Sequence, residues 1–209
     1  MKSMSNMWLR ARRSAARLLK DRSGIAATEF AVIVPIMLVM FFGTIEFSSA
    51  VAIDRKVTLM ARALVDLTSQ ASVVSDADIA NFRAASNYIM LPYSPPVYIV
   101  PNTTISELYI DPSTGVARVQ WSQGTAPRAT SSTVAIPPSL IALDANGKII
   151  PNQYLLFSEV GFLYTPTVGY VMVKTGVNLS DVAYTRPRQS TCVFYPSAPA
   201  GNPPPCPTL

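Results

Sequence analysis

Residues 25–47 read IAATEFAVIVPIMLVMFFGTIEF, an apolar run whose only ionisable side chains are Glu29 and Glu46. At a rise of about 1.5 Å per residue, these 23 positions form a helix of roughly 35 Å, which is enough to cross the ~30 Å hydrocarbon core of a bilayer. A buried helix of a soluble domain is ordinarily shorter and less uniformly apolar. The run therefore predicts a transmembrane helix.

Residues 1–24 form a basic leader in front of this run. They contain seven Lys and Arg against one Asp, a net charge of +6, whereas the other 185 residues contain ten basic and eleven acidic groups. Because basic residues stay on the cytoplasmic side, the amino terminus is expected in the cytoplasm and everything after residue 47 outside the membrane. The near-neutral body lacks the basic stripe of a nucleic-acid-binding domain, so no nucleic-acid partner is expected.

The composition excludes several kinds of catalytic and metal site. The chain has no His and two Cys, which rules out Ser-His-Asp catalysis, Cys-His catalysis, His-ligated zinc and a four-thiolate metal site within one chain. The remaining carboxylates show no pair at a recognisable catalytic spacing. We therefore expect no enzyme, no catalytic residue, no cofactor, no metal and no small-molecule substrate.

The distribution of Pro and Gly predicts a helical region at 48–91 and a β-rich region at 92–191. Of 18 prolines only Pro35 precedes residue 92, and of nine glycines only Gly24 and Gly43 do. Both residue types interrupt helices, so the transmembrane helix is expected to continue to about Gln70. Its outer part carries an apolar stripe of residues spaced three and four apart: Val57, Met60, Ala61, Leu64 and Leu67.

Local signals predict the other elements. A capping box at residues 75–78 starts a second helix, which is expected to end before Leu91-Pro92. Residues 105–110 and 116–121 flank the turn sequence DPSTG and predict a β-hairpin, while the runs 154–164, 168–174 and 177–184 predict a meander. The expected fold class is α+β: a long amino-terminal transmembrane helix that continues into a head with a second helix and an antiparallel sheet.

The last segment, residues 192–209, is rich in Pro and contains both cysteines, Cys192 and Cys206. On the exported side of a membrane two thiols can oxidise, and closing a loop of about 15 residues is worth roughly 3 kcal/mol in the chain-entropy model. Two unpaired thiols are the alternative. We expect an irregular tail closed by a disulfide.

The start of the apolar run carries a motif, RSGIAATEF at residues 22–30, in which Glu29 is the fifth residue after Gly24. A charge inside a membrane helix is costly and needs a partner. Cleavage between Gly24 and Ile25 would create an α-amino group about one helical turn from Glu29, and the amine of a neighbouring subunit could serve equally well. A carboxylate that snorkels to the membrane face is the alternative interpretation.

This motif resembles the processing site of type IV prepilins, and its Glu-Phe pair with the nearby Pro35 is similar to the TadE/TadG-like family of the tight-adherence (Flp) pilus system. Segments 54–57, 75–78, 159–160 and 184–188 also look like members of that family. The resemblance implies a pseudopilin with a pilin-like head that acts in pilus assembly from the inner membrane. It also implies that a prepilin peptidase cuts between Gly24 and Ile25, and that Glu29 and Phe30 serve recognition and assembly. The implied partners are that peptidase, other pilins and pseudopilins, the inner-membrane assembly platform and the lipid bilayer.

An exported or membrane-anchored periplasmic enzyme or binding protein is the alternative function. The sequence Ser48-Ser49-Ala50 satisfies the small-residue rule of signal peptidase, so that cleavage before Val51 is conceivable. Against it, the apolar run is too long for a signal-peptide core and Glu46 lies just before the site. A mitochondrial presequence explains neither Gly24 nor Glu29.

Overall fold

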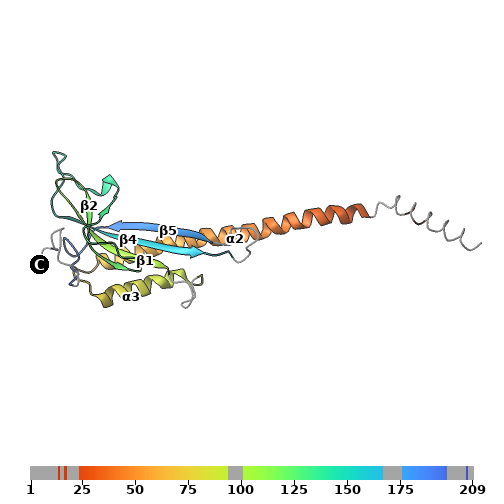
Figure 1. Ribbon diagram of the computed structural model, residues 1–209, viewed down its shortest axis with the longest axis horizontal. Helices are drawn as coiled ribbons and strands as arrows, with labels where there is room; N and C mark the ends of the chain where they lie inside the picture. Colours follow the sequence, from red (N-terminus) through yellow and green to blue (C-terminus); the bar gives the residue numbers. More distant parts are fainter. Residues whose placement is uncertain are drawn as a thin grey trace, which may run out of the picture. The chain divides into compact units, whose positions relative to one another are not determined.

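The computed structural model describes residues 24–93, 101–166 and 176–196, with Ser14, Arg17 and Cys206. The chain divides into two compact units, Met1–Glu46 and Phe47–Leu209. The second unit is an α+β head, as predicted from the sequence (Figure 1). The described elements are α2 (Gly24–Ser69), α3 (Asp76–Asn87), the 3-10 turn η1 (Tyr88–Met90), β1 (Asn102–Ile110), β2 (Ala117–Gly124), β3 (Thr133–Val134), the 3-10 turn η2 (Pro138–Leu140), β4 (Gln153–Tyr164) and β5 (Val177–Thr185).

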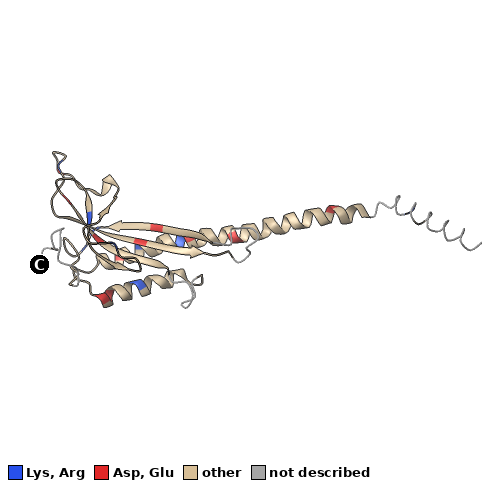
Figure 2. Ribbon diagram, viewed as in Figure 1, with Lys and Arg blue, Asp and Glu red and all other residues tan. Residues whose placement is uncertain are grey.

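The helix α2 contains 46 residues and includes Pro35 without interruption. Its amino-terminal part is long and apolar enough to cross a membrane, and Figure 2 shows that this part is almost free of charged side chains. Large apolar side chains stay exposed from Ile25 to Phe47. Such a surface needs an apolar environment, and the finding agrees with a helix that anchors the protein in a membrane.

The outer part of α2 changes from an all-round apolar surface to a single apolar stripe. Ile53, Val57, Met60 and Leu64 are at most 1% exposed and pack in one core cluster with side chains of the sheet. The hydroxyl of Ser158 in β4 donates a hydrogen bond of 2.7 Å to the backbone carbonyl of Ala61. The same helix therefore supplies both the apolar segment and the central core element of the head.

The second helix begins with the predicted capping box. The backbone N–H of Ser75 donates to the Asp78 carboxylate at 2.9 Å, and the N–H of Asp78 donates to the Ser75 hydroxyl at 3.3 Å. At the other end, the Lys56 ammonium of α2 donates to the carbonyls of Ile89 and Leu91 at 2.7 and 2.9 Å. These bonds fix the carboxyl end of the α3–η1 segment against α2.

The sheet is antiparallel in the order β3-β2-β1-β4-β5. The predicted β1–β2 hairpin turns at Gly115, whose φ of +72° suits a residue without a side chain. One face of the sheet packs on α2 and the other contributes to a second core cluster, which the connection between β3 and β4 covers with Ile136, Leu140 and Ile141. The strand predicted at 168–174 lies outside the described residues.

Shortening a core side chain of α2 tests this packing. Leu64→Ala is expected to lower the free energy of unfolding by about 2–5 kcal/mol, because Leu64 is 0% exposed and its removal leaves a cavity. Leu59→Ala is the matched control, since Leu59 lies on the same helix but is 55% exposed, and a change within about 0.5 kcal/mol is expected there. Thermal unfolding of the detergent-solubilised protein, followed by circular dichroism, measures both. Equal losses in the two variants would contradict the packing.

Candidate functional site

The four residues predicted for cleavage and assembly lie together in the first two turns of α2. Gly24 is the first described residue of α2, and a Cβ added to it would have no atom within 4 Å. Ile25 and Phe30 are 52% and 67% exposed, and Glu29 is exposed as well. The glycine, the residue that follows it and the carboxylate are therefore not covered by any described part of the chain.

Glu29 has no described partner in its own chain. None of the described residues forms a side-chain hydrogen bond or an ion pair with its carboxylate, and the ion pairs of the described regions join Arg128 to Glu159 and Arg188 to Asp66. Thr28, the residue before it, instead donates to the carbonyl of Ile25 at 2.8 Å. A carboxylate in this position is therefore available to a cation from outside the helix.

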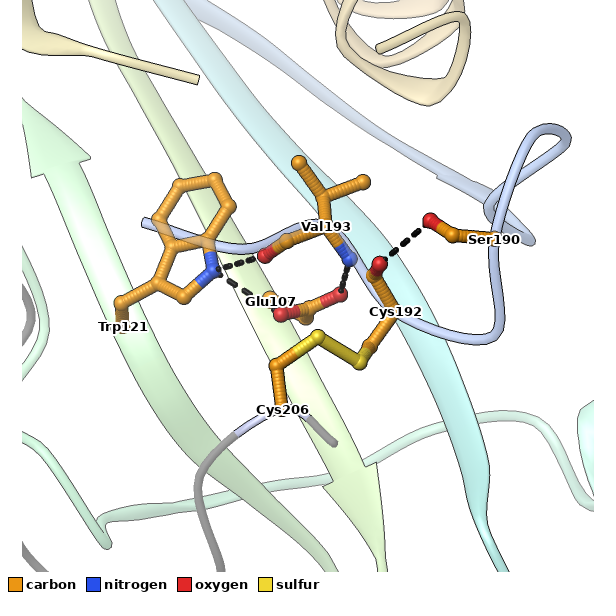
Figure 3. Close-up of a disulfide and its surroundings, with 6 residues drawn as sticks. All are labelled: Glu107, Trp121, Ser190, Cys192, Val193 and Cys206. Carbon is orange, nitrogen blue, oxygen red and sulfur yellow. Dashed lines mark hydrogen bonds between the residues drawn. A yellow bond between two sulfur atoms is a disulfide. The ribbon is translucent and has the colours of Figure 1, made fainter. Parts of the chain in front are cut away.

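A second acidic residue, Glu107 in β1, is 0% exposed and lies in the interior of the head (Figure 3). One carboxylate oxygen accepts the backbone N–H of Val193 at 2.6 Å, and the other accepts the indole N–H of Trp121 at 2.9 Å. The same indole N–H also lies 3.0 Å from the carbonyl of Val193. Glu107 thus connects strands β1 and β2 to the segment that follows the sheet.

Burial raises the pKa of Glu107 to about 8, and the hydrogen bonds from Val193 and Trp121 oppose this rise. A fully buried carboxyl cannot meet a substrate in solution, and the groups that contact it are a main-chain amide and an indole. The arrangement is that of a structural anchor, because the two donors satisfy both oxygens at once. Sequence reasoning missed this residue, although its position two residues after Ile105 in a predicted strand placed it on the same face as a core side chain.

The segment held by Glu107 belongs to the core of the head. Val193 and Tyr195 are 0% and 3% exposed. The backbone of Phe194 exchanges two hydrogen bonds of 2.9 Å with the connection between α2 and α3, one with Ser72 and one with Val74. The described residues of this segment, 192–196 and 206, contain no helix or strand, but they contribute to the apolar core and form one isolated bridge, Val73–Phe194.

Cys192 and Cys206 form a disulfide with their Cα atoms 5.8 Å apart. Figure 3 shows it directly beside Glu107 and Val193. Both cysteines pack with Tyr154 in a small buried cluster. The disulfide thus attaches the chain at residue 206 to the segment that Glu107 and Trp121 hold.

Further upstream, Arg188 contacts the end of α2. Its guanidinium pairs with the carboxylate of Asp66, and its backbone N–H donates to the carbonyl of Ser69 at 3.0 Å. In the described parts of the chain, no group of three or more His, Cys, Asp or Glu side chains is placed to hold a metal ion. The contacts of this region therefore serve the attachment of the carboxyl-terminal segment.

The described part of the chain thus combines a long helix that is apolar enough to cross a membrane with an α+β head, an arrangement consistent with a membrane-anchored protein. Residues 24–65 match the family model described as "TadE-like protein". In that segment the chain is similar to a family of pilus components, and the similarity indicates involvement in the tight-adherence pilus system. No curated protein and no solved structure matches the chain.

The buried carboxyl predicts a specific dependence of stability on pH. A pKa of about 8 in the folded head, against an ordinary value near 4.5, means that the unfolded chain loses this proton first as pH rises. The contribution of protonated Glu107 to the free energy of unfolding is therefore fully present below about pH 4.5 and is lost as pH rises through about 8. The loss is about 1.4 kcal/mol per pH unit within this range and a few kcal/mol in total.

Denaturant unfolding at several pH values between about 5 and 8 measures this effect. The chain has no His, so few other groups titrate in this range. Glu107→Gln removes the ionisable group and is expected to flatten the dependence of the free energy of unfolding on pH. The variant can be less stable at low pH, because the amide NH₂ of Gln cannot accept the hydrogen bond that one of the two donors, Val193 N–H or Trp121 indole N–H, gives to Glu107. The exposed control Asp144→Asn should keep the wild-type slope. A wild-type profile without any decline would contradict the assignment.

Proposed function

We propose that this protein is a minor pseudopilin of a tight-adherence (Flp) pilus. In this proposal residues 1–24 stay in the cytoplasm, a prepilin peptidase cuts between Gly24 and Ile25, and residues 25–47 hold the product in the inner membrane with its head in the periplasm. The observation that carries the proposal is the first described part of α2. Glu29 follows Gly24 by just over one helical turn, and the family match begins at the same glycine.

The open position of Gly24 supports its role as the cleavage site. Nothing described in the chain covers the bond between Gly24 and Ile25, and a glycine presents no side chain to an approaching protease.

The charges created by cleavage explain why a carboxylate is placed at residue 29. A new α-ammonium group at Ile25 would lie at the positive end of the helix dipole, where a cation is unfavourable. Glu29 is four residues further on, at the spacing at which side chains of one helix face meet. It can stabilise its own amine or that of a neighbouring subunit, and the second pairing would order one α2 helix against the next during assembly.

The exposed apolar surface of α2 supports association as the mode of action. Phe30 and the following apolar side chains are free to contact lipid, other pilins and pseudopilins, or the inner-membrane assembly platform. Among the described acidic residues, Glu107 has the most strongly raised pKa, and this residue is fully buried and serves as a structural anchor. The chemistry in this proposal is therefore performed on the protein by the peptidase.

The exported enzyme or binding protein gains no support from the fold. The sequence Ser48-Ser49-Ala50 lies inside the unbroken helix α2, whose next turns are buried in the head through Ile53 and Val57. Proteases bind their substrates in an extended form, so cleavage before Val51 would require the opening of this helix and of the core that it completes. The bond between Gly24 and Ile25, in contrast, lies outside the part of α2 that packs in the head.

Mass spectrometry of the mature protein tests the cleavage directly. Ile25 is expected as the amino-terminal residue, and Gly24→Leu is expected to leave the precursor uncut because a branched side chain replaces the open position. Gly24→Ala should be processed normally or somewhat more slowly. Gly43→Leu is the matched control, since it makes the same change further along the same helix and should be processed normally. A mature protein that begins at Val51, or normal processing of Gly24→Leu, would refute the proposal.

Substitution of Glu29 tests the assembly step. Glu29→Gln removes the charge but retains the shape, and it is expected to reduce surface pili by about tenfold or more because the amine loses its counter-charge in an apolar environment. The fold of the head should be unchanged. Asp54→Asn, an exposed carboxylate of α2 within the head, is the control and should give normal pili. Immunoblots of sheared pili measure the yield, and normal yield from Glu29→Gln would remove Glu29 from the mechanism.

A further inference from the structure

We propose that the outer edge of β5 is a docking site for an extended segment of another protein, which adds to the sheet as a further antiparallel strand. The site, named here the β5 groove, consists of this strand edge and of the open groove between β5 and α2. The segment that fits it carries the charge pattern Glu-x-Lys. All residues of the site belong to the unit Phe47–Leu209, and the inference does not depend on the proposed role in pilus assembly.

Strand β5 is the long open edge of the described sheet. In the order β3-β2-β1-β4-β5 it pairs with β4 over the nine residues Val177–Thr185 and with no other described strand. The strand at the opposite edge, β3, is only two residues long. An open edge of this length presents a row of backbone N–H and C=O groups with which an added strand can pair.

One hydrogen bond shows which backbone groups of β5 face outward. The N–H of Val182 donates to Oδ1 of Asp181 at 2.8 Å, which directs it away from β4. Residues of an antiparallel pair alternate between the two sides, so Ser180 and Tyr184 also direct backbone groups outward. Within the described ranges, no backbone group outside the β4–β5 pair bonds to this strand. An added strand would therefore meet three alternate residues with open backbone groups, and it would displace one side-chain bond.

A groove of about 430 Å³ lies beside this edge, between β5 and the outer part of α2. Ala183 lines it from β5. Ala183 pairs with Ser158, whose hydroxyl bonds to α2, so its side chain is on the α2 face of the sheet. Because this side chain is a single methyl group, a longer side chain placed opposite it on an added strand can enter the groove. Leu59 of α2, 55% exposed, provides an apolar wall.

Two charged side chains at the site have no ion-pair partner among the described residues. Arg62 of α2 lines the groove together with Ala183, and no described side chain pairs with its guanidinium. Asp181 lies two residues before Ala183 on the same face of β5, and its carboxylate accepts only a backbone N–H of its own strand. The other two charges, Asp66 and Arg188, pair with each other. The site therefore presents one cation and one anion at separate positions along β5.

These two charges select the order of charges on the added strand. An antiparallel strand places one residue opposite Ala183 and the next but one opposite Asp181, both with side chains toward α2. A Glu at the first position can pair with Arg62, with its methylene groups against Leu59, and a Lys at the second lies opposite Asp181. Opposite charges in such cross-strand positions are stabilising and like charges are destabilising. Glu-x-Lys therefore fits the site, whereas Lys-x-Glu brings like charges together at both positions.

A second copy of β5 fits this pattern less well. Paired antiparallel about Val182, it would place its own Asp181 opposite Ala183. That side chain is one methylene group shorter than Glu, and it already accepts an N–H of its own strand. Both copies would have to give up this bond on pairing. The inference therefore commits to a segment of a different protein.

Peptide binding to the detergent-solubilised full chain tests the site. The probe is the fluorescein-labelled peptide Thr-Val-Glu-Val-Lys-Val-Thr, and the control peptide Thr-Val-Lys-Val-Glu-Val-Thr has the same composition and net charge. Fluorescence anisotropy is expected to show about tenfold tighter binding of the first peptide, because the second places like charges together. Methylation of the central Val nitrogen, which faces β5, should abolish binding, whereas methylation of the Lys nitrogen, which faces away, should not.

Exchange of the two charges in the protein tests their assignment. The double variant Arg62→Glu with Asp181→Lys is expected to prefer the control peptide by about tenfold, a reversal that a loss of structure would not produce. The matched control is the double variant Asp54→Lys with Arg55→Glu, which makes the same exchange at exposed residues of α2 outside the groove. It should keep the wild-type preference. Equal affinity of the wild-type chain for both peptides, or no binding of either, would overturn the inference.

Cysteine crosslinking without peptide tests the competing occupant. If two β5 strands paired about Val182, its two Cα atoms would lie about 5.5 Å apart, within the range of a disulfide. The Cα atoms of Ser180 would be roughly 14 Å apart in the same register. Neither Val182→Cys nor Ser180→Cys is expected to crosslink under mild oxidation. Crosslinking of Val182→Cys but not of Ser180→Cys would identify a second copy as the occupant and overturn the inference.

Discussion

The continuous backbone hydrogen-bond ladder of α2 is the constraint on which the rest of the structure depends. A segment in hydrocarbon must satisfy all its backbone polar groups internally, and a helix does so without help from water. Here the same ladder continues past Phe47 into a region where the helix packs against a sheet. Only the side chains differ between the two parts of the helix. They are apolar on all sides of α2 up to Phe47, and apolar along a single stripe beyond it.

The carboxyl-terminal segment closes the head on this helix. It contacts the end of α2 through Arg188, the α2–α3 connection through Phe194, and the sheet through Val193. Glu107 lies where the last of these contacts meets strand β1, and the disulfide attaches residue 206 beside it. Residues 188–194 therefore hold the end of α2, the α2–α3 connection and strand β1 together. The fold of the head is complete only when these residues, which follow β5, are in place.

The sequence predicted the elements that depend on local signals and missed those that depend on distant contacts. The end of α2, the capping box at Ser75 and the β1–β2 hairpin follow from periodicity, caps and turn residues, which act over a few positions. The motif at Gly24 and Glu29 is also local, and its role in cleavage stays a prediction. Alternation placed Glu107 on the same face as Ile105, but it could not predict that a carboxyl group stays buried there, because its partners Trp121 and Val193 are distant in the sequence. The Pro content of the last segment indicated irregular structure correctly for its backbone, but it hid the fact that Val193 and Tyr195 fill the core.

Glu29 and Glu107 show two solutions to the same physical difficulty, a carboxylate in apolar surroundings. Glu107 takes its partners from within the fold, and these donors fix it so that it has no capacity left for another molecule. Glu29 is on an exposed helix face with no described partner, and in the proposed function an amine supplied by cleavage or by a neighbouring subunit stabilises it. Under that proposal, the first arrangement holds the head together and the second leaves a charge that favours association. Assembly would then use both, because a firmly closed head allows the pairing of one charge to position one subunit against the next.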